Sequence, residues 1–174
     1  MTQTLTPQSR VPDLTLALVG GGEFDLASAQ AEKFHILVVY RGVHCPKCQA
    51  QLKEIETEFN DLAVDGFSVV ALSMDSKDRA QRAKDEWEIE TLPIAYGMDI
   101  STAKSFGLFI SDALSEKEPP HFSEPGIFVV RPDGTLYAQY IQNTPFGRVP
   151  IREIASGLKY VAENDYPVRG TSTV

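Results

Sequence analysis

The sequence predicts an α/β domain in which a central mixed β-sheet is flanked by helices. Two apolar runs, residues 34–40 and 67–73, are rich in β-branched residues and are typical of strands buried on both faces. Each run is followed by a predicted helix, an alternation that favours parallel strands joined by right-handed crossovers. Two later runs flank the turn at 132–134 and predict an antiparallel hairpin, which makes the sheet mixed. The length of 174 residues suits one domain with one core.

The first predicted helix carries clear signals at both of its ends. Pro46 suits the first turn of a helix, and Asp65-Gly66 suits its end. The apolar stripe between them consists of Leu52, Ile55, Phe59 and Leu62. We therefore expect a helix from Pro46 to about Val64.

The rest of the chain divides into shorter predicted elements. In chain order they are a strand at 11–18, a short strand or turn at 23–26, a helix at 77–88 capped by Ser76, an extended piece at 92–96, a short helix capped by Ser101, a loop with partial order at 109–124, strands at 126–130 and 135–141, and a helix opened by Pro150. We predict that residues 1–10 form a flexible N-terminal arm, that 11–166 form the folded domain and that 167–174 form a tail.

Charge and hydropathy exclude several function classes. The formal net charge is −8, and an acidic protein is a poor partner for nucleic acid or for an anionic membrane. The longest apolar stretch is far shorter than the ~20 residues of a membrane-spanning helix. The first residues show no basic start followed by an apolar run, so we expect no signal peptide and a cytoplasmic location.

The sequence contains two cysteines, Cys45 and Cys48, and they are three positions apart. A disulfide across so short a loop removes little chain entropy, so a structural staple is a poor explanation. Redox chemistry is the better one, because a C-x-x-C that follows a strand and begins a helix is typical of thiol–disulfide enzymes. The alternative is half of a zinc site, which needs about four ligands.

The predicted position of Cys45 assigns unequal roles to the pair. A helix start offers free N–H groups and the positive end of the helix dipole, and both stabilise a thiolate. Cys48 lies one turn further along the same face of the helix. We therefore expect Cys45 to be the more exposed, attacking cysteine and Cys48 to be the inner, resolving one.

Two segments carry a resemblance to a known family. The run from Val38 to Cys48 contains Tyr-Arg-Gly followed by Cys-Pro-Lys-Cys, and a second stretch, Glu124 to Gly134, begins a strand with Pro125. Together they resemble the peroxiredoxin-like branch of the thioredoxin superfamily, the group named for alkyl hydroperoxide reductase and thiol-specific antioxidant proteins. The resemblance covers roughly residues 10–165. It implies a thioredoxin-like fold with an N-terminal extension, and a cis Pro125 that faces the cysteine pair.

The sequence departs from that family's pattern at three positions. Typical peroxiredoxins carry a proline and a threonine seven and three residues before the reactive cysteine, where this chain has Val38 and Gly42. The family's arginine near the later strand aligns with Pro125. Groups that would position and polarise a peroxide are therefore missing from the expected places. Arg41 or Arg148 can substitute for the arginine, although an arginine in a loop is more often solvated. His44 can help to hold the thiolate, and a solvent-exposed histidine is about as frequent.

These observations predict a thiol–disulfide oxidoreductase or antioxidant enzyme that uses Cys45 and Cys48, with hydroperoxide reduction as a weak second activity. Pro125, Arg41 and His44 are the supporting residues. The cycle needs no bound cofactor or metal, and its electrons come from a dithiol protein or a small thiol. The substrate is a disulfide or a peroxide, and formation of a homodimer stays open.

A copper-binding thioredoxin-fold protein is the alternative function. Such proteins pair two cysteines with a histidine in the loop before the late strand, where this chain has His121.

Overall fold

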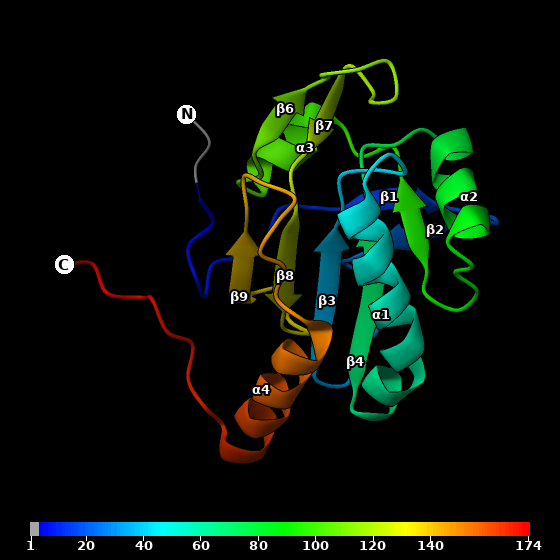
Figure 1. Ribbon diagram of the computed structural model, residues 1–174. Helices are drawn as coiled ribbons and strands as arrows, with labels where there is room; N and C mark the ends of the chain where they lie inside the picture. Colours follow the sequence, from blue (N-terminus) through cyan, green and yellow to red (C-terminus); the bar gives the residue numbers. More distant parts are fainter. Residues whose placement is uncertain (1–3) are drawn as a thin grey trace.

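The computed structural model describes residues 4–174, so the first three residues of the predicted arm lie outside the described residues. Within this part of the chain a seven-stranded mixed sheet is covered by helices on both faces, and a small two-stranded hairpin lies beyond one end of it (Figure 1). The strands are β1 (Thr15–Leu18), β2 (Glu23–Asp25), β3 (Phe34–Val39), β4 (Phe67–Leu72), β5 (Ile94–Tyr96), β6 (Ile110–Asp112), β7 (His121–Ser123), β8 (Gly126–Val130) and β9 (Leu136–Ile141). The helices are α1 (Pro46–Val64), α2 (Lys77–Glu86), α3 (Ile100–Ser105) and α4 (Ile151–Asn164).

The sheet order is β2-β1-β5-β4-β3-β8-β9, which places β3 well inside the sheet. β3 pairs in parallel with β4 and antiparallel with β8. β4 pairs in parallel with β5, whereas β9 is antiparallel to β8. The predicted α/β class, the mixed sheet and its central strand are therefore confirmed.

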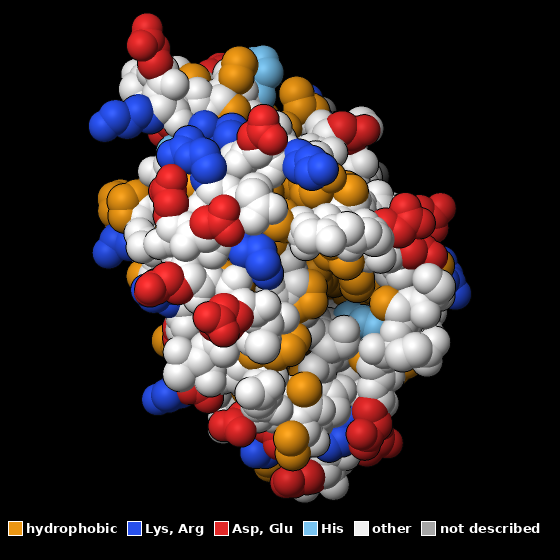
Figure 2. Space-filling model, turned by 90° about the vertical axis from the view of Figure 1, so that its right-hand side faces the viewer, with side chains coloured by type: hydrophobic (Ala, Val, Ile, Leu, Met, Phe, Trp, Pro, Cys, Tyr) orange, Lys and Arg blue, Asp and Glu red, His pale blue; other side chains and the backbone are white. Residues whose placement is uncertain are grey.

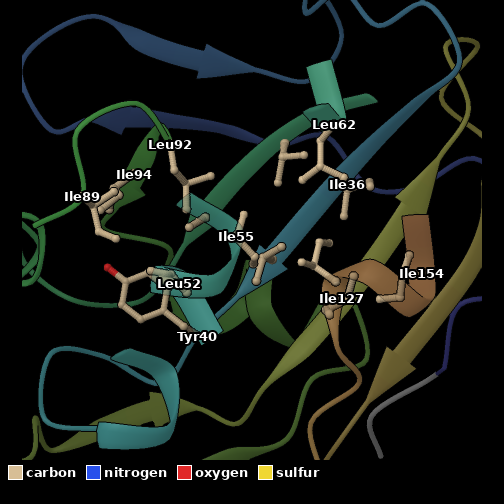
Figure 3. Close-up of a cluster of buried hydrophobic side chains, with 14 of the residues drawn as sticks. Ile36, Tyr40, Leu52, Ile55, Leu62, Ile89, Leu92, Ile94, Ile127 and Ile154 are labelled. Atoms are coloured by element: carbon tan, nitrogen blue, oxygen red, sulfur yellow. The ribbon is translucent and has the colours of Figure 1, made fainter. Parts of the chain in front are cut away.

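Every residue of β3 is buried, because the strand is covered on both faces. On one face its side chains meet α1, α2 and α4 in the larger core cluster (Figure 3). On the other face they meet α3 and the chain before β1, which contributes Val11 and Leu14, in a second cluster. Leu52 and Ile55 of α1 are fully buried, and each contributes about 1.5–3 kcal/mol. This packing fixes the start of α1 at the carboxyl end of β3, which is where the cysteines lie.

Helix α1 follows its sequence signals closely. Pro46 is its first residue, the cap at its end is Asp65, and Gly66 follows with a φ of +91°. A side chain at Gly66 would be strained in that left-handed conformation, so glycine suits this turn. The predicted bounds of α1 are therefore confirmed.

The order expected within residues 109–124 is an antiparallel pair of short strands, β6 and β7. Two other short predictions are wrong. The cap of α3 is Asp99, whose carboxylate accepts the Thr102 N–H at 2.7 Å, and not Ser101. The first strand begins at Thr15, four residues later than predicted from Val11. Each error concerns a short element, where four to six residues give little periodicity to detect.

Residues 8–10, called the N-terminal segment below, run beside the outer strand β9. The Gln8 N–H donates to the Leu136 carbonyl, and the Leu136 N–H donates to the Ser9 carbonyl, both at 2.9 Å. An isolated bridge joins Arg10 to Thr135. The division into arm, domain and tail stays a prediction.

Charges of both signs are interspersed on the face shown in Figure 2, without a large patch of one sign. In the described part of the chain, no helix is both long enough and apolar enough to cross a membrane.

Two glycines provide a matched test of the packing. A Cβ added at Gly126 of β8 would lie 2.6 Å from Leu108 Cδ2, whereas at Gly157 of α4 it would meet nothing within 4 Å. We expect Gly126→Ala to lower the free energy of unfolding by about 1–3 kcal/mol. Gly157→Ala should raise it by about 1 kcal/mol, because glycine is a poor helix former. Urea unfolding of both variants measures the difference, and equal effects would contradict this account of the core.

Candidate active site

Cys45 lies at the junction of β3 and α1 and is the cap residue of α1. Its N–H donates to the Gly42 carbonyl at 3.1 Å, which closes a turn between the strand and the helix. Its sulfur accepts the Cys48 backbone N–H at 3.3 Å. Both cysteines are free thiols in this structure. The spacing seen in the sequence thus places the second cysteine one helical turn from the first, at the positive end of the helix.

The expectation that Cys45 is the more exposed cysteine is wrong. The exposed fractions are 1% for Cys45 and 0% for Cys48. Arg148, in the loop between β9 and α4, covers both of them. Its Nη2 atom lies 3.2 Å from Cys48 Sγ and 3.9 Å from Cys45 Sγ. The two cysteines differ in their hydrogen-bond environment, not in their access to solvent.

The pKa values of the two thiols are shifted in opposite directions. Hydrogen bonding from the Cys48 side chain is the largest cause that lowers the pKa of Cys45, to about 5. The Cys48 backbone N–H and the Arg41 guanidinium act in the same direction, whereas burial opposes them. Burial, together with the neighbouring Cys45 sulfur, raises the pKa of Cys48 well above its ordinary value. The site therefore holds one thiolate and one thiol near neutral pH.

Arg148 is fixed by contacts on each side of its guanidinium. Its Nε donates to the Pro145 carbonyl at 2.7 Å, and its Nη1 donates to Gln51 Oε1 at 2.6 Å. Gln51 is buried on the same face of α1 as Cys48, one turn further along. Sequence reasoning missed Gln51, although a polar residue on the buried face of a predicted helix was a usable signal. Arg148, considered as a substitute for the family's arginine, lies at the sulfurs.

Arg41 approaches the cysteines from the end of β3. Its backbone N–H donates to Cys48 Sγ at 3.3 Å. Its Nε lies 2.9 Å from Glu124 Oε2, and Ser111 Oγ donates to Glu124 Oε1 at 2.7 Å. The guanidinium lies over the ring of Phe122, with its carbon 4.8 Å from the ring centre. This second cation is thus held by a buried carboxylate, Glu124, which sequence reasoning did not single out.

The implied cis conformation at Pro125 is wrong, because no cis peptide bond occurs among residues 4–174. Glu124 donates its N–H to the Phe109 carbonyl at 2.8 Å, and the Pro125 carbonyl accepts the Gln142 N–H at 3.0 Å. The chain thus runs from β7 into β8 through a segment that is bonded on both sides, and the trans isomer is the usual one. Pro125 is buried beside Glu124.

Gly42 has a structural reason to differ from the family's threonine. Its φ is +143°, a conformation that residues with side chains rarely adopt. A Cβ there would lie 2.8 and 3.0 Å from the carboxylate oxygens of Asp75 and 3.0 Å from His44 Cε1. The space that a threonine side chain needs is therefore filled by these two residues.

His44, Arg79 and Asp75 form a series of hydrogen-bonded side chains next to the turn that holds Cys45. The Nδ1 atom of His44 is 3.0 Å from Arg79 Nη2, and Arg79 Nε is 2.8 Å from Asp75 Oδ1. Asp75 Oδ2 also accepts the Val43 N–H at 2.8 Å. Sequence reasoning noted His44 as a supporting residue. It missed Arg79, which lies one helical turn after Asp75.

His121 is not part of this arrangement. It is an exposed residue of β7, and its Nδ1 lies 2.8 Å from Asp112 Oδ1. Across residues 4–174, no group of three or more histidine, cysteine, aspartate or glutamate side chains has the arrangement of a metal site.

A cavity of about 260 Å³ opens beside Arg148. It lies between the first turns of α1 and the loop before α4, and its lining includes Lys47, Gln51, Glu54, Phe146 and Arg148. Arg148, which contacts both sulfurs, is thus also part of the wall of this cavity.

Several solved structures with a similar fold are described as peroxiredoxins. A mutant of peroxiredoxin 6 from Arenicola marina matches with a TM-score of 0.75 at 17% identity, covering 92% of this chain and 75% of that one. Reduced Prx3 in complex with hydrogen peroxide from Vibrio vulnificus matches with a TM-score of 0.74 at 15% identity, covering 89% and 99%. The reduced 2-Cys peroxiredoxin of Plasmodium vivax matches with a TM-score of 0.75 at 14% identity, covering 92% and 84%. The chain thus has the thioredoxin-like fold that its motifs predicted.

The family assignment rests on the sequence itself. The family model described as AhpC/TSA matches residues 7–139, more than half of the chain. The chain therefore belongs to the AhpC/TSA family and is an oxidoreductase of the antioxidant class. No match was found among curated protein sequences.

The opposite pKa shifts predict how pH affects the stability of the reduced protein. The lowered pKa of Cys45 contributes stability that is complete above the ~8.5 of an unfolded cysteine and is lost as pH falls towards about 5. The raised pKa of Cys48 lowers the free energy of unfolding, and it does so only above pH ~8.5, where an unfolded cysteine loses its proton. The free energy of unfolding of the reduced wild type, minus that of reduced Cys45→Ser, should therefore grow from pH 5.5 to pH 8. A difference that stays constant over this range would contradict a stabilised thiolate.

Proposed function

We propose that this protein is a thiol–disulfide oxidoreductase in which Cys45 attacks and Cys48 resolves, with hydroperoxide reduction as a slower activity of the same pair. One observation carries the proposal. The Cys48 backbone N–H donates to the Cys45 sulfur at 3.3 Å, and the pKa of Cys45 is lowered while that of Cys48 is raised. The attacking thiolate and the proton-bearing resolving thiol are therefore neighbours before any substrate arrives.

Reduction of a disulfide follows two exchange steps. The Cys45 thiolate attacks one sulfur of the substrate, a bond forms between protein and substrate, and the other substrate sulfur leaves as a thiolate. Cys48 then loses its proton and attacks Cys45 Sγ. The second substrate thiolate leaves, and an internal Cys45–Cys48 disulfide remains. Two electrons have passed from the cysteine pair to the substrate.

Reduction of a hydroperoxide uses the same two sulfurs. The Cys45 thiolate attacks the terminal peroxide oxygen, the O–O bond breaks, and the remaining oxygen leaves and takes up a proton. Cys45 is then a sulfenic acid. Attack by the Cys48 thiol releases water and forms the same internal disulfide. Both substrates thus lead to one oxidised state, which a single reductant can restore.

The reductant that we propose is a dithiol protein or a small thiol, so the cycle requires no bound cofactor. Arg148 contacts both sulfurs, so its side chain must move before a substrate can reach them. The cavity beside Arg148 then offers these molecules a route to the site. The acidic composition supports our proposal that neither nucleic acid nor a membrane is the partner. A cytoplasmic location completes the proposal, which leaves the formation of a homodimer open.

Arg41 and Arg148 supply the positive charge that such a site needs. Arg41 lowers the pKa of Cys45, and Arg148 contacts both sulfurs. In the first step negative charge moves from Cys45 onto the leaving group, and in the second it appears on Cys48. Cations held beside both sulfurs stabilise these charges. Pro125, buried beside Glu124, helps to shape the side of the site that holds Arg41.

The two cysteines should behave differently when each is replaced by serine. Cys45→Ser should lose almost all reactivity with disulfide substrates, because the only thiolate is gone. Cys48→Ser should still attack but should accumulate a covalent adduct, because nothing expels the substrate. Mass spectrometry without reductant detects the adduct, and the oxidised wild type should be two hydrogens lighter than the reduced form. The assignment is reversed if the adduct accumulates in Cys45→Ser instead.

Reaction with hydrogen peroxide should be slow compared with peroxiredoxins that carry the threonine absent here. Gly42 has no hydroxyl, and a missing preorganised donor costs about 10²–10³ in rate. Stopped-flow measurement of the fluorescence of Trp87 or of thiol loss gives the rate constant. A fast, saturable reaction would show that Arg41, Arg148 or another group fully replaces the missing donor.

A further inference from the structure

Gln51 is a buried polar side chain on the face of α1 that carries Cys48, with 7% of its surface exposed. Its Oε1 accepts a hydrogen bond from Arg148 Nη1 at 2.6 Å, and Nη2 of the same guanidinium donates to Cys48 Sγ at 3.2 Å. A guanidinium can only donate, so the amide oxygen is the atom that faces it. One planar cation therefore connects Gln51 to the sulfur of Cys48.

The loop before α4 holds Arg148 from the other end of its side chain. The Nε of Arg148 donates to a carbonyl of its own loop at 2.7 Å. The side-chain amide of Gln142 donates to the carbonyls of Phe146 and Gly147, at 3.0 and 2.6 Å, and these two bonds close the loop. The loop thus fixes the base of the arginine side chain, and Gln51 fixes the direction of its guanidinium.

The thiol of Cys48 carries the proton that the second exchange step must remove. Burial is the largest cause that raises its pKa, the Cys45 sulfur raises it further, and Arg148 acts in the opposite direction. The Arg41 backbone N–H also donates to Cys48 Sγ, at 3.3 Å. Tyr40 is another titratable neighbour, but burial raises the pKa of its hydroxyl, so this group stays neutral. Arg148 is therefore the charged side chain that favours a thiolate at Cys48.

The first exchange step removes one of the causes that keep the proton on Cys48. Once Cys45 is bonded to a substrate sulfur, or has become a sulfenic acid, its sulfur no longer carries the negative charge that opposes a second thiolate. Burial of Cys48 and the cation Arg148 then remain as opposing influences on its pKa. The rate of the second step at neutral pH therefore depends on how closely Arg148 approaches Cys48 Sγ.

We propose that Gln51 is a positioning residue for the second exchange step, because it holds the Arg148 guanidinium against the Cys48 sulfur while this thiol loses its proton. The inference rests on the proposed roles of the two cysteines. The Cys48 proton passes to solvent, and the sulfur then uses its electron pair to form the bond to Cys45 Sγ. The bond between Cys45 and the substrate sulfur breaks, and that sulfur leaves as a thiolate with the electron pair of the broken bond.

The test separates the two steps with dithiobis(nitrobenzoate), an aromatic disulfide whose released thiolate is coloured. Attack by Cys45 releases the first thiolate in a phase whose rate rises with the concentration of the reagent. Closure by Cys48 releases the second in a phase whose rate does not. We expect Gln51→Met to slow the second phase about 3–30-fold at neutral pH and to move its pH profile to higher pH, because a hydrogen bond to a charged group is lost. The first phase should not slow, since Arg148 covers Cys45 in the wild type.

Two further variants test whether Gln51 acts through Arg148. Gln49→Met is the matched control, because it makes the same substitution two residues earlier on α1, on a different face of the helix. It should leave both phases unchanged. Arg148→Met removes the cation and should slow the second phase at least as much as Gln51→Met does. The double variant should be no slower than Arg148→Met alone.

The outcomes separate the inference from the proposed function. An unchanged second phase in Gln51→Met would overturn the inference, and so would an equal slowing of both phases, which indicates a structural role. An effect of Gln51→Met that persists in full when Arg148 is already absent would also overturn it. The proposed function itself fails if the wild type releases no second thiolate, or if the second phase persists in Cys48→Ser, whatever the Gln51 variants do.

Discussion

The structure of the site depends on the hydrogen bond that the backbone N–H of Cys48 gives to the sulfur of Cys45. A buried thiolate is costly unless donors surround it, and here the donor at 3.3 Å belongs to the residue one helical turn away. This arrangement requires that α1 begins at Cys45 itself, which Pro46 favours as the first residue of the helix. It also requires that β3 is held rigidly, and burial on both faces provides that. The junction between β3 and α1 therefore determines where the two cysteines lie and how their sulfurs are hydrogen-bonded.

Positive charge reaches this junction from distant parts of an acidic chain. Arg41 follows β3 directly, whereas Arg148 comes from the loop before α4, about a hundred residues later in the sequence. Each cation is oriented by a buried acceptor, Glu124 for Arg41 and Gln51 for Arg148. The net charge of −8 therefore says little about the local field at the sulfurs. Local placement decides the pKa values, since a buried contact is screened far less than charges on the surface.

Sequence patterns predicted the parts of this protein that local chemistry determines. The buried strand at 34–40, the bounds of α1 and the turn at 132–134 all follow from residues that are neighbours in the chain. The burial of Cys45 could not be predicted in this way, because the side chain that covers it, Arg148, arrives through tertiary packing. The same holds for Glu124 and for Arg79, which look like ordinary surface charges in the sequence. The trans bond before Pro125 shows the limit of a resemblance, since neighbours in the fold determine the isomer.

The N-terminal segment beside β9 has a consequence for how copies of this chain meet. An outer strand with free N–H and C=O groups is a template for pairing with another molecule, and it is a common origin of aggregation. Residues 8–10 occupy this template at the beginning of β9, where Leu136 exchanges hydrogen bonds with Gln8 and Ser9. The opposite outer strand, β2, is only three residues long and begins with the charged Glu23. A second copy therefore cannot continue the sheet at the start of β9 without first displacing the N-terminal segment.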